Sequence, residues 1–415
     1  MNSMLKQLNA TLREAVDALD GPFKRELLDA LKSPDSLPDK ETWKLAFETV
    51  DLADKIIRQV QPPALQLAES YLAYLDTKCL WTAVSNNIPD ILASSGPQPI
   101  TELARLSGLQ PLRLRQIMRV LHNNGIFSHD AATGRYSNSA SSLLLTKTHW
   151  TQWYRWVELY GNEFYDAARQ IPAAVQADEV RSAAQIAYGT NQNIFAYFAA
   201  RGLQDKFHAT LGAGAVAQAP GMLADYPWEG LGDATVLDVG GGGGDFIAAL
   251  LRTHQGLRGA LLELESVVAM VRPRFRDADG LFADVGDRMV ALHIGDFRNE
   301  VPAYEVYTMK WCLHNWGDLD VVRILSAVRR AIVETPRARM VIIEAVLAEG
   351  RSSRVWRFGD MTMMSTVNGQ ERTEEEWRSV AAKAGWVIKS ISPLRNAWAA
   401  AIDLRPIKID VDSSA

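Results

Sequence analysis

The chain has 415 residues, of which 47% are hydrophobic and 22% charged, and its formal net charge is −5. This ordinary composition predicts two or more globular domains, and the acidic balance argues against a general surface for nucleic acid or an anionic membrane. The two cysteines, Cys79 and Cys312, match no metal-binding spacing, so we expect neither a disulfide framework nor a zinc site. Residues 1–30 carry charges throughout, and no apolar run reaches membrane-spanning length, so we expect a cytoplasmic protein without a secretory leader.

Helical spacing of apolar residues dominates the first part of the chain. A series of leucines predicts an amphipathic helix over about residues 1–32, and a proline-containing loop at 33–39 separates it from a second helix at about 41–60. Pro62 and Pro63 then end the second helix, and a third apolar tract follows at 65–75. These long apolar tracts predict a partner surface.

The next segment has the pattern of a winged helix. Two helices are predicted at 99–109 and 111–122, followed by a short hairpin whose turn contains Thr133 and Gly134. Such a module reads DNA in many proteins, and its second helix contains three arginines. Because the chain is acidic overall, we favour a packing and dimerisation module over DNA binding.

Five consecutive glycines, Gly240–Gly244, follow an apolar run that ends in Asp238 and Val239. This pattern predicts a buried parallel strand, a tight turn that exposes backbone N–H groups to a ligand, and a helix from Asp245 onward. Asp245 stands where a dinucleotide-binding loop has glycine, which argues against NAD or FAD. A glycine turn that serves packing alone is the alternative. Six further strand-like runs predict a doubly wound sheet with ligands at its carboxyl edge. These runs are 259–262, 289–293, 304–309, 339–344, 387–391 and 398–402.

Five short segments recur in an order and spacing that resemble S-adenosylmethionine (SAM)-dependent small-molecule O-methyltransferases of the caffeic-acid and fungal-polyketide type. They are Asp238–Phe246, Gly295–Phe297, Lys310–Asp318, Ile342–Glu344 and Gly369–Thr373. The resemblance covers about residues 64–405. It implies an N-terminal helical extension over 1–62, a winged-helix dimerisation and substrate-lid domain over 63–205, and a Rossmann-like, seven-stranded methyltransferase domain over 206–415. It also implies a homodimer.

The resemblance implies that SAM binds along the glycine loop and leaves as S-adenosylhomocysteine. The implied contacts are Asp238, Gly240, Gly242, Gly244, Glu263, Asp296, Phe297 and Lys310. Glu263 stands where the family has aspartate, and its carboxylate suits the two ribose hydroxyls, although a solvated strand end is the alternative. Asp296 and Phe297 would meet the adenine, unless they are an ordinary turn acid and a core aromatic. Lys310 would be a contact on the cofactor side or merely solvated. No metal ligand is implied.

His314 is the general base that the resemblance implies. A phenol with a pKa of about 10 is a poor nucleophile until its proton leaves, and a neutral imidazole with a reference pKa of about 6.5 can accept that proton. An isolated histidine is usually structural, but the surrounding residues 313–318 favour the catalytic interpretation. Glu344 and Glu371 match the two acids that flank this histidine in the family. Glu344 ends an apolar strand, where an unpartnered charge is costly, whereas the charged stretch around Glu371 also fits a solvated surface.

These observations predict methylation of a phenolic or enolic hydroxyl of a secondary metabolite, with an aromatic small molecule as substrate. Two alternatives stay open. One is recruitment of the same fold to a non-methylating dehydration or pericyclic cyclisation, and the other is a winged-helix DNA binder. Several apolar side chains fit either the substrate pocket or the core. They are Trp153, Trp156, Phe195, Phe198, Phe207, Met361, Met363 and Met364.

Overall fold

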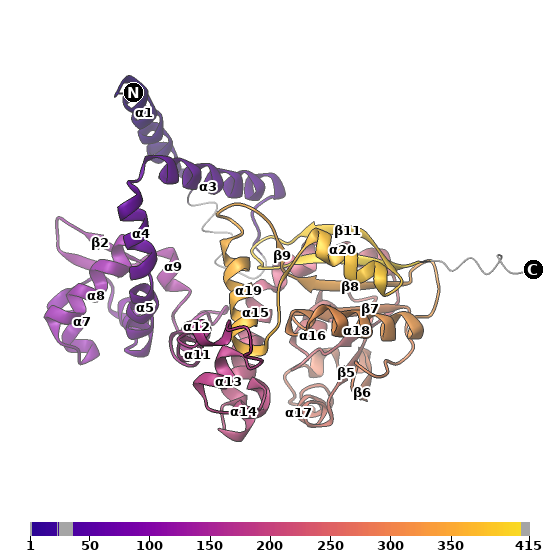
Figure 1. The fold of residues 1–415 in the computed structure, drawn as a ribbon. Helices are drawn as coiled ribbons and strands as arrows, with labels where there is room; N and C mark the ends of the chain where they lie inside the picture. The colour runs from indigo at the N-terminus through magenta and orange to yellow at the C-terminus, as the bar shows by residue number, and fades with distance from the viewer. Residues whose placement is uncertain (1, 23, 25–35, 408–415) are drawn as a thin grey trace, which may run out of the picture.

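A computed structural model describes residues 2–22, 24 and 36–407. A mostly helical part is built from the first half of the chain, and a sheet-centred part follows it (Figure 1). The first predicted helix is present as α1 (Asn2–Leu19), and residues 23 and 25–32 of that prediction lie outside the described residues. No helix of the described chain is both long and apolar enough to cross a membrane.

The predicted doubly wound sheet is present and has seven strands in the order β11-β12-β8-β7-β4-β5-β6. Strand β12 is antiparallel to both of its neighbours, whereas the pairs from β8 to β6 are parallel. All seven predicted strands are confirmed. Their bounds are β4 Thr235–Val239, β5 Arg258–Glu263, β6 Met289–Ile294, β7 Val306–Lys310, β8 Arg339–Glu344, β11 Trp386–Pro393 and β12 Ala400–Pro406.

Helices cover both faces of this sheet. On one face α15 (Gln204–Asp225), α16 (Asp245–Thr253) and α17 (Glu265–Arg276) share a core with Val236 of β4. On the other face α18 (Asp318–Ala331) and α20 (Glu374–Lys383) share a core with Leu237 and Val239. Successive strand side chains point to opposite faces, so a strand covered on both sides must be apolar throughout. Strand β4 lies between β5 and β7, at the switch point where such sheets bind ligands.

The small helical domain contains the predicted helix–turn–helix and hairpin. Helices α7 (Ile100–Ser107) and α8 (Pro111–Asn123) precede strands β2 (Phe127–Asp130) and β3 (Arg135–Asn138), and β1 (Gln98–Pro99) adds a third strand beside β3. Gly108 ends α7 with φ of 72° and Gly134 turns the hairpin with φ of 66°, a left-handed conformation that glycine adopts at little steric cost. These elements enclose their own core, which includes Leu103, Leu114 and Met118.

A group of short helices between the small domain and the sheet packs on α19 (Arg354–Val367). Helix α15 begins at Gln204, so the predicted domain boundary between residues 205 and 206 lies in its first turn. The short helices are α10 Tyr154–Gly161, α11 Glu163–Ala168, α12 Ile171–Ala174, α13 Ala183–Ala187 and α14 Ile194–Ala200. The other short elements are α6 Ile88–Ser95, α9 Ala140–Leu143, η1 Trp228–Leu231, η2 Ala283–Arg288, β9 Val346–Leu347 and β10 Arg372–Thr373.

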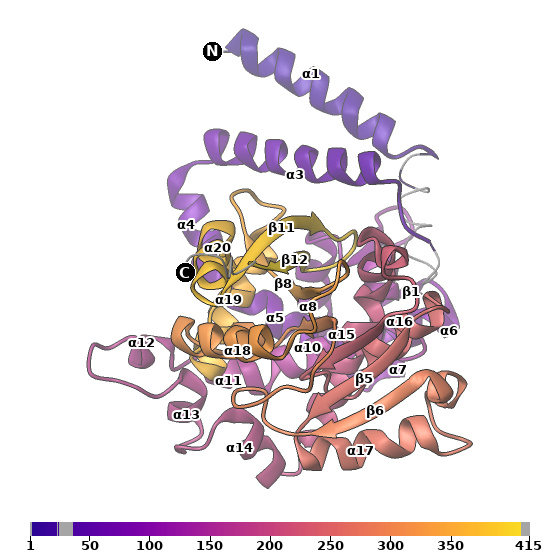
Figure 2. The same ribbon diagram turned by 90° about the vertical axis from the view of Figure 1, so that its right-hand side faces the viewer.

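The N-terminal helices lie along one side of the molecule, with α1 further out than α3 (Lys40–Val60) (Figure 2). Helix α1 buries none of its side chains. Helix α3 is attached to the sheet domain just before α19, because Asp51 accepts hydrogen bonds from the backbone N–H of Ser352 at 2.7 Å and from its hydroxyl at 2.9 Å. Helices α4 (Pro63–Leu72) and α5 (Tyr74–Ser85) then connect α3 to the small domain.

Candidate active site

The glycine turn, residues 240–244, connects β4 to α16 at the switch point of the sheet. Gly240, Gly242 and Gly244 all have positive φ, of 67°, 54° and 81°. A Cβ at Gly244 would lie 2.7 Å from the ring of Phe275, whereas a Cβ at Gly242 would meet nothing within 4 Å. The turn therefore packs tightly against the protein near α16 and leaves open space at Gly242, as a cradle for a ligand requires.

Arg274 of α17 fixes the outer side of the glycine turn. Its guanidinium donates to the carbonyl oxygen of Gly243 and contacts the carboxylate of Asp245 at 3.2 Å. This residue was not singled out from the sequence, because nothing in the local pattern of α17 shows that its side chain reaches back to the turn.

Two carboxylates stand at the strand ends beside the glycine turn. Asp238 is buried, and its Oδ1 accepts a hydrogen bond from the Thr308 hydroxyl at 2.8 Å, while Oδ2 has no partner among the described residues. Burial raises the pKa of Asp238 to about 7. Glu263 accepts hydrogen bonds from the N–H groups of Gly242 at 3.1 Å and Leu264 at 2.9 Å, and burial raises its pKa too. A ligand that donates hydrogen bonds would satisfy the orphaned oxygen of Asp238.

Phe297 and Trp316 form an aromatic corner on the far side of the glycine turn. The Phe297 ring would lie 3.3 Å from a Cβ at Gly240, and its centroid is 6.4 Å from that of Trp316 in an edge-to-face arrangement. Asp296 is close in sequence, but its carboxylate is bound by the guanidinium of Arg298 at 2.6 Å. The adenine contacts of Asp296 and Phe297 therefore stay predictions, and Trp316 is a neighbour that the sequence did not single out.

Lys310 ends β7 between the glycine turn and the histidine cluster. Burial lowers its pKa, although the nearby Asp238 and Glu344 carboxylates oppose that effect. Its ammonium lies 4.3 Å from the ring centre of Trp311, a residue with φ of 48°. A bulky side chain in the left-handed region is strained, and such strain is concentrated at functional sites.

The predicted triad of His314, Glu344 and Glu371 is brought together at the carboxyl edge of the sheet. Glu344 ends β8 and is fully buried, and its Oε1 accepts hydrogen bonds from the N–H groups of Cys312 at 2.7 Å and Leu313 at 2.9 Å. These contacts fix the start of the short 3-10 turn η3 (Leu313–Asn315), which carries the histidine. The parallel pairing of β9 with β10 brings Glu371 alongside the chain that follows β8.

Both carboxylates lie at the same nitrogen of His314. Its Nδ1 is 2.8 Å from Oε1 of Glu371 and 3.2 Å from Oε2 of Glu344. A neutral imidazole that donates from Nδ1 leaves the lone pair of Nε2 free to accept a proton. The three side chains also bring metal-ligating atoms within 4.8 Å of one another. The hydrogen bonds of Glu344 to the backbone and of Glu371 to the imidazole account for this arrangement without a metal ion.

The two carboxylates make His314 unusually basic. Burial alone would lower its pKa, but Glu344 and Glu371 outweigh that effect and raise the pKa to about 9. Burial in turn raises the pKa of Glu344 to about 7, with His314 opposing the rise and Glu371 adding to it. His314 and Glu344 therefore titrate as an interacting pair.

We expect His314 to titrate near pH 9 in the protein, and Glu371→Gln to lower that pKa because a negative neighbour is removed. The pKa is above the reference value of about 6.5, so the stability that this charge contributes is complete below pH 6.5 and is lost as the pH rises through 9. Imidazole NMR shifts and the pH dependence of thermal unfolding measure the two effects. Glu375→Gln, on the exposed side of α20, is the control. Titration of His314 near pH 6.5 in the unaltered protein would contradict the proposed coupling.

Arg372 supports the chain that follows the histidine turn. It is fully buried and donates to the carboxylate of Asp318 at 2.9 Å and to the carbonyl of Trp316 at 2.8 Å. The chain at Gly369 packs closely against the histidine turn, because a Cβ at Gly369 would collide with the carbonyl oxygen of His314. The sequence indicated this segment through its resemblance to the family, but only Glu371 was given a role.

Aromatic side chains reach the cluster from α10. Tyr160 lies near Glu371, and burial raises its pKa to about 12, with a hydrogen bond to Thr362 opposing the rise. Trp156 packs on Tyr160 with ring centres 5.8 Å apart and meets the edge of Trp311 at 6.0 Å. These rings form a connected aromatic group from Tyr160 through Trp156 to Trp311, and the sequence did not predict the place of Tyr160.

The structure shows the surroundings of several apolar side chains that the sequence assigned to either the substrate pocket or the core. Phe198 and Phe207 belong to a buried core of the helices that pack on α19, and Phe195 packs edge-to-face on Phe207. Trp153 stacks on Trp398 at 4.9 Å and so extends the aromatic group around Trp156. Of the three methionines, which are all on α19, Met361 is exposed.

The doubly wound sheet with a glycine turn at its switch point places the chain among α/β proteins that bind a ligand at the carboxyl edge of the sheet. Residues 170–387 match the O-methyltransferase domain family, and residues 68–148 match the O-methyltransferase dimerisation domain. The chain belongs to this O-methyltransferase family.

Individual relatives extend this likeness over the whole chain. The O-methyltransferase verK of Clonostachys rogersoniana is 67% identical over 98% of this chain and 100% of its own length. The O-methyltransferase gliM of Aspergillus fumigatus is 46% identical over 97% of this chain and 94% of its own length. Among solved structures, CalO1, a methyltransferase in calicheamicin biosynthesis in its SAH-bound form, has a TM-score of 0.72 and 27% identity over 83% of this chain and 98% of its own.

Proposed function

We propose that the protein transfers a methyl group from SAM to a phenolic or enolic hydroxyl of a secondary metabolite, with His314 as the general base. The observation that carries this proposal is the pair of carboxylates at Nδ1 of His314, which leaves Nε2 for the substrate, next to a glycine turn with open space at Gly242. Family membership supports the reaction class.

The residues present fit the cofactor. SAM supplies a methyl group on a positively charged sulfur, which is already activated for displacement. The orphaned oxygen of Asp238 and the carboxylate of Glu263 offer complementary hydrogen-bond acceptors for a polar, cationic ligand. Phe297 and Trp316 would enclose its aromatic part, with Asp296 and Lys310 nearby.

His314 prepares the acceptor oxygen. The hydroxyl proton moves to Nε2 of His314, and the electron pair of the broken O–H bond stays on oxygen, which becomes nucleophilic. The resulting imidazolium is stabilised by Glu344 and Glu371 at the opposite nitrogen. With a pKa of about 9, His314 is mostly protonated at pH 7, and the neutral form that accepts the proton grows as the pH rises toward 9. Once His314 is neutral, proton transfer from a phenol with a pKa of about 10 is nearly balanced in energy.

The reaction is tested by intact-mass analysis of products from a panel of polyketide and alkaloid phenols, with and without SAM. We expect a mass gain of one methyl group only when SAM is present, together with release of S-adenosylhomocysteine. Turnover of a substrate without consumption of SAM would instead indicate the non-methylating chemistry and would overturn the proposal.

Gly242→Ala tests where the cofactor lies. A Cβ at Gly242 meets no protein atom within 4 Å, and the positive φ of 54° strains an alanine there, so we expect a folded but less stable variant. It should lose cofactor affinity, because the methyl group would occupy the cradle. Gly134→Ala is a matched control, since Gly134 also has positive φ and no atom within 4 Å of its Cβ but lies in the hairpin. Calorimetric titration with S-adenosylhomocysteine makes the comparison. Equal affinities for S-adenosylhomocysteine in the two variants would contradict the placement of the cofactor at the glycine turn.

We propose that the protein is a homodimer that uses its N-terminal helices. Leu67 and Tyr71 are one helical turn apart on α4 and are 66% and 64% exposed, where the segment that matches the dimerisation domain, residues 68–148, begins. We expect Leu67→Asp with Tyr71→Asp to shift the protein toward monomer in light scattering, because charges would be buried in the interface. Leu319→Asp, on α18 and 89% exposed, is the control. A dimer unaffected by the paired substitution would contradict this assignment.

A further inference from the structure

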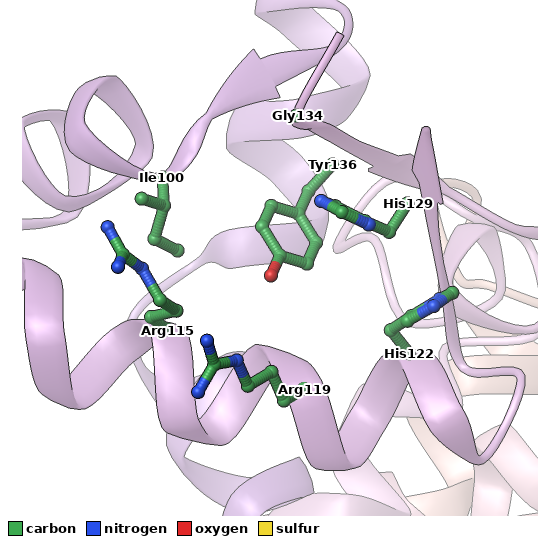
Figure 3. Close-up of a pocket in the computed structure, with 7 residues that line it drawn as sticks. All are labelled: Ile100, Arg115, Arg119, His122, His129, Gly134 and Tyr136. Carbon is green, nitrogen blue, oxygen red and sulfur yellow. The ribbon is translucent and has the colours of Figure 1, made fainter. Parts of the chain in front are cut away.

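A cavity of about 450 Å³ lies in the small helical domain, between α8 and the β2–β3 hairpin (Figure 3). It shares no residue with the His314 cluster, and its walls come from the helix–turn–helix and hairpin, within the segment that matches the dimerisation domain. The lining residues are Ile100, Arg115, Arg119, His122, His129, Gly134 and Tyr136.

One wall of the cavity is a row of basic side chains. Arg115, Arg119 and His122 follow one another at spacings of four and three residues, which places them along one face of α8. The opposite wall is aromatic, because His129 and Tyr136 are direct partners across the hairpin with ring centroids 4.5 Å apart. In Figure 3 Arg119 extends from α8 into the space below the Tyr136 hydroxyl, whereas the guanidinium of Arg115 is directed toward Ile100.

The two arginines of this row, Arg115 and Arg119, make no ion pair among the described residues, 2–22, 24 and 36–407. Glu102 of the preceding helix binds Arg105 at 2.6 Å, and Asp130, which follows His129, accepts a hydrogen bond from the Thr133 hydroxyl at 2.6 Å. Two like charges one helical turn apart repel each other, so an anion between them would relieve the repulsion.

We propose that this cavity binds a small molecule that carries a phosphate group. Arg115 and Arg119 would hold the phosphate oxygens through their planar guanidinium forks, and the Tyr136 hydroxyl would add a donor. A concave site of this volume suits a small ligand, whereas an extended nucleic-acid backbone would need a longer basic track than an acidic chain offers.

The test is calorimetric titration of the full chain with inorganic phosphate and with pyrophosphate in a chloride buffer. We expect saturable binding with one site per chain, weakened about tenfold or more by Arg115→Met with Arg119→Met. Arg119→Lys keeps the charge but loses the fork, so it should give an intermediate loss. Arg113→Met is the matched control, because Arg113 is on α8 but does not line the cavity.

Two results would overturn the proposal. One is the absence of saturable binding in the unaltered protein, and the other is equal binding in the double variant and in Arg113→Met. A third measurement, binding of duplex DNA at several salt concentrations, distinguishes the sources of phosphate. Affinity for DNA that falls steeply with salt and is weakened by Arg113→Met would identify the ligand as nucleic acid and not a small molecule.

Discussion

His314→Ala is expected to lower kcat by about 10²- to 10⁴-fold, the usual contribution of a positioned general base. The affinity for S-adenosylhomocysteine should stay close to that of the unaltered protein, because the contacts of the imidazole are with Glu344 and Glu371 and not with the glycine turn. Steady-state kinetics and calorimetric titration measure the two quantities separately.

Two further variants control this experiment. His314→Gln fills more of the space and offers an amide to the carboxylates, so it separates loss of the base from loss of folding. His254→Ala removes a histidine at the end of α16, whose imidazole lies near the Leu223 carbonyl and away from the triad, and should leave kcat unchanged. A fully active His314→Ala protein would contradict the role of His314 as the general base.

Arg372→Met is expected to reduce kcat by at least about tenfold and to lower the free energy of unfolding by about 1–3 kcal/mol, the cost of leaving buried partners without a hydrogen bond. The side chain acts by position, because it holds the Trp316 carbonyl and the Asp318 carboxylate directly after the histidine turn. Urea unfolding and kinetics provide the measurement.

A merely structural role of Arg372 would not change the titration of His314. The pH profile of activity therefore distinguishes a positioning role from a structural one. We expect the pKa of His314 to shift in Arg372→Met, since the turn would no longer hold the imidazole between its two carboxylates. Arg372→Lys should restore part of the activity. Arg378→Met, at an exposed ion pair on α20, is the control, and a profile identical in all three variants would contradict the positioning role.

The sheet could be predicted because its strands are short apolar runs separated by helices, which is what burial on both faces requires. Glu344 was identifiable for the same reason: a carboxylate at the end of such a run needs a partner, and its partners are the N–H groups of η3 and the imidazole. The glycine turn was predictable from the local sequence, in which five consecutive glycines follow an apolar run.

Other parts of the site depend on tertiary contacts that no local pattern contains. The burial of Arg372 could not be inferred from a charged stretch that also contains the exposed Glu374 and Glu375. Tyr160 reaches Glu371 from a helix more than two hundred positions earlier in the chain. Asp296 is paired with Arg298 only two residues away, a contact that the motif did not predict, and its adenine contact stays a prediction.

The central claim is that His314 takes the proton of the acceptor hydroxyl, and a series of phenols of graded acidity tests it most directly. The ratio of kcat/KM between the unaltered protein and His314→Ala is measured for each phenol at one pH. We predict a large ratio for phenols with a pKa of about 10, falling toward one for phenols that are already ionised, because these need no base. A ratio that does not change across the series would contradict the claim.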